Sequence, residues 1–119
     1  MKTPVFTKPV FGLAGCPDIL AAVRATGRST AVLAGFETDV CVTHSAVGLA
    51  EAGYRVVVAV DAVESPAGAQ AHGLARLRDL DVELVHCKGI YYDWVRTLEA
   101  ALAFQDAHPE LSEPPGFWI

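Results

Sequence analysis

The sequence predicts an α/β fold: a parallel, Rossmann-like sheet covered by helices in a three-layer α/β/α arrangement. Three apolar runs, at residues 30–36, 55–60 and 82–86, have the composition of strands buried on both faces of a sheet. Stretches with helical spacing of apolar residues separate these runs. Because strands that alternate with helices are joined by right-handed crossovers, the sheet is expected to be parallel.

Proline and glycine mark the ends of the expected elements. Pro17 suits the first turn of a helix, whereas Gly27 and Gly53 each follow a helical stretch and suit its end. Helices are therefore expected over residues 17–26, 40–52, 71–80 and 91–107, a short strand over residues 4–7, a loop over residues 65–69 and an irregular tail over residues 109–119.

Length and composition limit the classes of function. A chain of 119 residues fits one domain, and 52% hydrophobic against 19% charged residues excludes a disordered chain. A net charge of -5 argues against nucleic acid as a partner, and no apolar run approaches the roughly 20 residues of a membrane helix. The three cysteines form no CxxC pair and show no zinc-like spacing with the histidines, so we expect a reduced, cytoplasmic protein without a metal or cofactor.

Residues 35–41 (GFETDVC) contain the candidate chemistry. They connect an expected buried strand to a helix and place Cys41 near the first turn of that helix, where the positive end of the helix dipole stabilises a thiolate. Thr38 or Asp39 is expected to cap the helix, and backbone N–H groups of the turn are available to an oxyanion. From position alone, an inert packed cysteine remains the alternative.

A longer pattern, LAGFETDVCV followed by HSAVGLAEAGYRVVVAVDAVESP, resembles the signature of the isochorismatase-like cysteine hydrolases, a superfamily that includes nicotinamidases. The family pattern Gly-x-x-Thr-Asp-x-Cys-Val is matched by Gly35, Thr38, Asp39, Cys41 and Val42. The matching region covers about residues 5–98 and implies the family's fold, with the supporting loop formed by Gly35, Thr38 and Asp39.

The resemblance implies a mechanism. Cys41 is similar to the family's nucleophile, Lys8 to its catalytic lysine, and the Phe36–Glu37 bond to its non-proline cis peptide. The N–H groups of Glu37 and Cys41 would then form the oxyanion hole. The implied reaction is hydrolysis of a C–N, amide-like bond of a small-molecule substrate through a thioester on Cys41.

The chain departs from the family pattern before Lys8. Only seven residues precede it, so the first two strands, with the family's catalytic Asp, are expected to be absent, leaving a single partial domain over residues 1–119. Residues 30–36 would then have a bare edge that invites another chain, and we expect a homo-oligomer. A truncated gene or fragment, completion by oligomerisation, and a catalytically inactive remnant that acts as an oligomeric or interaction protein all remain open.

Overall fold

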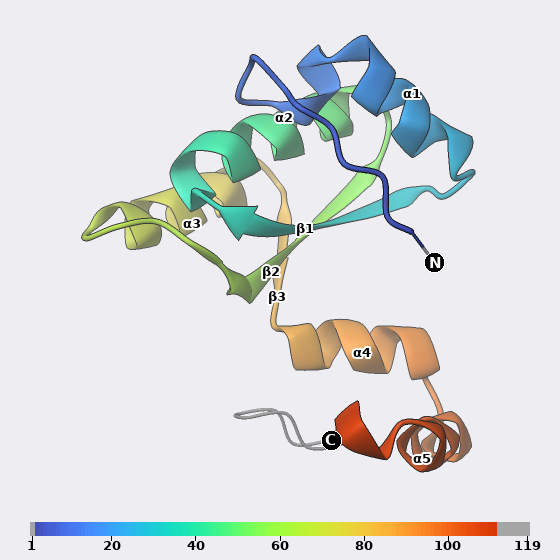
Figure 1. Cartoon of the computed structure of the whole chain (residues 1–119). Helices are drawn as coiled ribbons and strands as arrows, with labels where there is room; N and C mark the ends of the chain where they lie inside the picture. Colours follow the sequence, from blue (N-terminus) through green and yellow to red (C-terminus); the bar gives the residue numbers. More distant parts are fainter. Residues whose placement is uncertain (1, 112–119) are drawn as a thin grey trace. The chain divides into compact units, whose positions relative to one another are not determined.

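The computed structural model describes residues 2–111, so the part of the expected irregular tail after residue 111 lies outside the described residues. The chain divides into two compact units, Met1–Leu84 and Val85–Ile119, which are described separately below (Figure 1). Within residues 2–111, no helix combines the length and the apolar character that crossing a membrane requires.

The first unit is built on parallel strands. The sheet has the order β1-β2-β3, where β1 is Thr30–Phe36, β2 is Arg55–Glu64 and β3 is Glu83–Val85, whose last residue belongs to the second unit. β1 and β2 are parallel, with Thr30 opposite Arg55 and Leu33 opposite Val58. The α/β fold class predicted from the sequence is therefore confirmed.

Three helices, α1 (Pro17–Ala25), α2 (Thr43–Glu51) and α3 (Ala69–Asp79), accompany the strands of this unit (Figure 1). The core forms where Ala46 and Leu49 of α2 and Leu77 of α3 meet Val56 and Val58 of β2. Leu49, Val58 and Leu77 are at most 1% exposed. Burial of these side chains fixes α2, and with it the turn that precedes α2, relative to the end of β1.

The expectation that both faces of residues 30–36 are buried is wrong. Exposed and half-buried residues alternate along β1: Ala31 and Leu33 pack against the core, whereas Val32 is 39% exposed and Phe36 79%. A continuous apolar run is typical of a central strand, but β1 lies at the edge of the described sheet. Its apolar composition therefore did not reveal which face would stay exposed.

Two further expectations about strands are corrected. Residues 4–7 have no regular secondary structure. β2 continues to Glu64 instead of ending at residue 60. Between paired positions, β1 advances two residues, from Leu33 to Gly35, while β2 advances five, from Val58 to Val63. Such an irregularity bends a strand and re-aims its side chains, and here it lies at the end of the sheet that carries the candidate site.

The second unit contains two helices instead of the single helix expected over residues 91–107. α4 (Cys87–Val95) ends because Arg96 adopts a left-handed conformation with φ 62°. α5 (Leu98–Ala107) then begins, capped by Thr97, whose Oγ1 accepts a hydrogen bond from Ala100 N at 3.1 Å. The apolar spacing continues across the break, so periodicity alone could not separate the helices.

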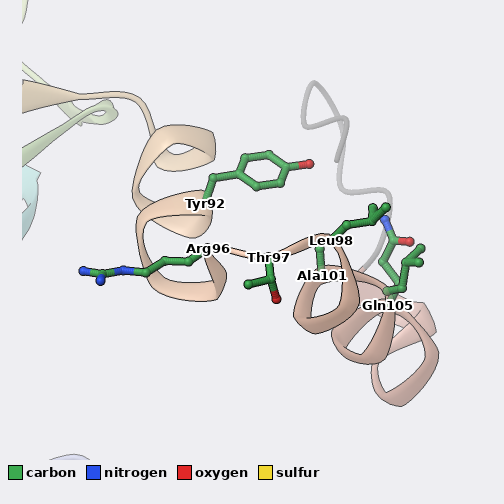
Figure 2. Close-up of a pocket in the computed structure, with 7 residues that line it drawn as sticks. Tyr92, Arg96, Thr97, Leu98, Ala101 and Gln105 are labelled. Atoms are coloured by element: carbon green, nitrogen blue, oxygen red, sulfur yellow. The ribbon is translucent and has the colours of Figure 1, made fainter.

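Figure 2 shows a cavity of about 340 Å³ formed by α4, α5 and the link between them. Its lining comes from Tyr92, Arg96, Thr97, Leu98, Ala101, Leu102 and Gln105. No residue of the predicted site lines this cavity.

Candidate active site

Cys41 lies in a single π-helical turn, Thr38–Val42, that leads directly into α2. The N–H groups of Val40 and Val42 both donate to Glu37 O, each at 3.1 Å. π turns occur frequently at functional sites. The turn leaves Cys41 half-buried, so its sulfur is neither sealed in the core nor fully exposed.

The approach to this turn has two unusual backbone features. Gly35, the penultimate residue of β1, has φ 115°, a conformation that residues with a Cβ rarely adopt. The Phe36–Glu37 peptide bond is cis, at the position where the family resemblance implies one. Together these residues form the connection between β1 and the π turn.

Lys8 and Cys41 lie close together in space, although 32 residues separate them in the chain. Lys8 Nζ is 3.5 Å from Cys41 Sγ. The same ammonium donates to Val10 O at 3.1 Å and to Phe11 O at 2.6 Å. Lys8 is therefore positioned by carbonyl groups of the loop that follows it, and not by the short strand that the sequence led us to expect.

A cavity of about 360 Å³ adjoins these two side chains. Its lining comes from Lys8, Leu13, Leu33, Ala34, Gly35, Phe36, Cys41, Val42 and Ser45. Ser45 is buried, and its Oγ accepts a hydrogen bond from Leu13 N at 3.1 Å, which joins Leu13 in the cavity wall to α2. A mainly apolar cavity with one cation and one thiol fits a small organic molecule.

The sequence led us to expect that Thr38 or Asp39 caps the helix, but neither does. Both side chains instead connect the π turn to neighbouring segments. No side chain caps the π turn. Asp39 instead pairs with Ser65: Ser65 Oγ donates to Asp39 Oδ1 and accepts from Asp39 N at 3.2 Å. Ser65 is 4% exposed and Asp39 is half-buried, so both bonds are partly shielded from water.

Thr38 is fully buried, and its Oγ1 donates to Gln70 Oε1 at 2.6 Å. The side-chain amide of Gln70 donates in turn to Val63 O at 3.1 Å. Gly73 of α3 lies against the same turn, because a Cβ there would come within 3.0 Å of Asp39 Cβ. The segment after β2 and helix α3 thus hold the π turn in place.

Sequence reasoning missed Ser65, Gln70 and Gly73. Ser65 belongs to the VESP run that matches the family signature, yet only its hydrogen bonds to Asp39 show what it does. Gln70 and Gly73 belong to an ordinary amphipathic helix and give no signal in the sequence.

A second cavity, of about 380 Å³, is lined by Phe36, Glu37, Glu64, Ser65 and Pro66. It shares Phe36 with the cavity beside Cys41. Among residues 2–111, no carboxylate contacts Lys8 Nζ or Cys41 Sγ, and no group of His, Cys, Asp and Glu side chains could hold a metal ion.

Comparison with solved structures identifies the same architecture in hydrolases. The YcaC gene product of Escherichia coli, described as an octameric hydrolase of unknown specificity, is 25% identical with a TM-score of 0.69 over 87% of this chain and 54% of its own. YcaC from Pseudomonas aeruginosa, solved with hexane-2,5-diol and covalent acrylamide, is 25% identical with a TM-score of 0.69 over 85% of this chain and 52% of its own.

The pyrazinamidase/nicotinamidase of Streptococcus mutans is 26% identical with a TM-score of 0.60, over 66% of this chain and 44% of its own. The chain thus spans about half the length of these three neighbours. No protein with a curated description matches the sequence. The sequence profile of the isochorismatase domain matches residues 2–86, well over half of the chain and including both Lys8 and Cys41. The chain belongs to the isochorismatase family.

Proposed function

We propose that this chain is a cysteine hydrolase that cleaves a C–N, amide-like bond of a small molecule, with Cys41 as the nucleophile. The observation that carries the proposal is the 3.5 Å contact between Lys8 Nζ and Cys41 Sγ at the wall of a cavity. A cation beside a sulfur stabilises the thiolate, which is the form of cysteine that attacks a carbonyl carbon.

In the proposed reaction, the Cys41 thiolate adds to the carbonyl carbon, and the N–H groups of Glu37 and Cys41 hold the resulting oxyanion. Collapse breaks the C–N bond, and the leaving nitrogen takes a proton and departs as ammonia or an amine. Lys8 is a proton donor in contact with the sulfur. Water then cleaves the thioester on Cys41, which releases a carboxylic acid and restores the thiol.

One neighbour supports this class of substrate, because it is named a pyrazinamidase/nicotinamidase. The E. coli neighbour is octameric, which supports our further proposal that the chain, as one partial domain of the family, assembles into a homo-oligomer.

A catalytically inactive oligomeric protein is the second candidate. It is favoured by the lack of a carboxylate in contact with Lys8 or Cys41 within residues 2–111. A site without a third group for proton transfer is expected to acylate slowly, or to stop at the thioester.

The experiment that separates the two candidates follows ammonia release and protein mass together. The whole chain is incubated with a panel of small primary amides, including nicotinamide and pyrazinamide. Ammonia release, or an acyl group on Cys41 detected by mass spectrometry of the peptides, supports the hydrolase. Cys41→Ala removes both signals, whereas Cys87→Ala, which changes a cysteine of the second unit, retains them. The absence of both signals across the panel contradicts the hydrolase.

A further inference from the structure

Ser45 of α2 has a hydroxyl hydrogen for which residues 2–111 provide no acceptor. The residue is 5% exposed, and its one hydrogen bond to the described part of the chain is the bond that its Oγ accepts from Leu13 N at 3.1 Å. A serine inside a helix can donate to the carbonyl group one turn earlier, but Ser45 makes no such bond to Cys41. Because a hydroxyl accepts and donates at the same time, the O–H of Ser45 is available to a ligand.

The residue adjoins the cavity that contains the proposed nucleophile. Ser45 lines the cavity of about 360 Å³ together with Lys8 and Cys41. It follows Cys41 by four residues, and residues with this spacing lie on the same side of a helix. A molecule in the cavity can therefore contact the sulfur of Cys41 and the hydroxyl of Ser45 at the same time.

Lys8 also has donors at this cavity, but they are already in use. An ammonium group has three N–H donors. Lys8 Nζ makes three contacts, with Val10 O, Phe11 O and Cys41 Sγ. The rest of the lining, apart from Ser45 and the nucleophile, has no polar side chain and consists of Leu13, Leu33, Ala34, Gly35, Phe36 and Val42. Ser45 is thus the side chain of this cavity that can donate to a substrate without giving up another bond.

We propose that Ser45 determines specificity by donating a hydrogen bond to a second acceptor atom of the substrate. This inference rests on the proposed amide hydrolysis, in which the N–H groups of Glu37 and Cys41 hold the amide oxygen. Ser45 therefore recognises a different atom. The substrate class is a small amide whose apolar body includes a further hydrogen-bond acceptor, such as a ring nitrogen. An amide without that acceptor leaves a buried hydroxyl unpaired, which weakens its binding.

Protection of Cys41 from iodoacetamide at neutral pH measures binding without requiring turnover. The probes are benzamide and its three pyridine analogues, picolinamide, nicotinamide and isonicotinamide, in which a nitrogen replaces one C–H at different ring positions. Peptide mass spectrometry follows the alkylation of Cys41, with Cys87 of the second unit as the internal reference. The amide concentration that halves the labelling rate of Cys41 gives an apparent affinity.

We expect the wild type to bind one pyridine analogue about tenfold more tightly than benzamide, because a fixed hydroxyl meets one of the three ring positions. Ser45→Ala should remove this preference, whereas Ser45→Thr, which keeps the hydroxyl, should retain it. The ratio of two affinities within one protein cancels those effects of a substitution that are common to both amides. Circular dichroism checks that each variant is folded.

Equal binding of benzamide and all three analogues by the wild type overturns the inference, and so does a preference that Ser45→Ala retains. Protection of Cys41 by none of the four amides also overturns it. If Ser45→Ala does not fold because Leu13 N has lost its acceptor, the other two proteins decide: one preferred analogue in both the wild type and Ser45→Thr supports the inference, and its absence from either overturns it.

Ammonia release, measured on the same samples, separates this inference from the proposed function. Ammonia release without a preference for any pyridine analogue supports the hydrolase and overturns the role of Ser45. A preference that depends on Ser45, without ammonia release or an acyl group on Cys41, supports the role of Ser45 in binding and contradicts the hydrolysis.

Discussion

Gly73 of α3 offers a sharp test of how the π turn is held. A Cβ at this position would lie 3.0 Å from Asp39 Cβ, 3.1 Å from Asp39 N and 3.1 Å from Thr38 Cγ2. One of these neighbours is a backbone atom and the other two lie close to the backbone, so Gly73→Ala forces α3 and the turn that carries Cys41 to move apart. The structure thus predicts that a substitution in α3 changes the reactivity of Cys41, which lies in the neighbouring turn.

The expected magnitude follows from two opposing contributions. Overpacking at a tight contact costs about 1–3 kcal/mol, whereas alanine in place of glycine inside a helix contributes about 1 kcal/mol of stability. Because these neighbours cannot swing away, we expect the cost near the upper end and a net loss of about 1–2 kcal/mol in the free energy of unfolding. The displaced turn should also slow alkylation of Cys41.

Urea denaturation measures the stability, and iodoacetamide labelling followed by peptide mass spectrometry measures the reactivity of Cys41. Ala75→Gly is the matched control, because Ala75 is exposed on the same helix and reports the helix propensity without a new contact. If Gly73→Ala is as stable as the wild type, or more stable, and Cys41 reacts at an unchanged rate, α3 does not hold the turn as described.

Three further predictions concern individual contacts. Ser65→Ala removes both hydrogen bonds to Asp39 and should cost about 1–3 kcal/mol, seen as a lower urea midpoint; an unchanged midpoint would show that water replaces the hydroxyl. Iodoacetamide at neutral pH should label Cys41 before the buried Cys16, and Lys8→Met should slow that labelling; equal rates in the variant and the wild type would contradict the role of Lys8. The hydrogen bonds and charge of Arg55 lower the pKa of the exposed Glu83 below its ordinary value of 4.5, so this ion pair stabilises the fold above that pH and is lost as the pH falls through the lowered pKa. Glu83→Gln should therefore make the free energy of unfolding slightly less dependent on pH below 4.5. The same pH dependence in the variant and the wild type, measured by urea denaturation, would refute this.

The sequence by itself determined the fold class and the location of the candidate site. Apolar runs separated by amphipathic stretches predict parallel strands joined by helices, since only that arrangement buries both patterns. The GFETDVC segment indicated a nucleophile at the start of a helix, because it follows an apolar strand, places Cys41 near the first turn of the next helix and matches the family pattern. These features are local, and local sequence specifies them.

Only the tertiary structure decided which groups meet at the site and which surfaces stay open. The contact of Lys8 with Cys41 and the hydrogen bonds of Asp39 with Ser65 join residues far apart in the chain, and composition and spacing leave such pairs undetermined. The exposure of Phe36 depends on which elements cover β1, and an apolar sequence does not indicate those elements. The break at Arg96 depends on a left-handed residue inside an unbroken apolar pattern. Such properties arise from packing between distant segments, and for that physical reason they appear only once the chain is folded.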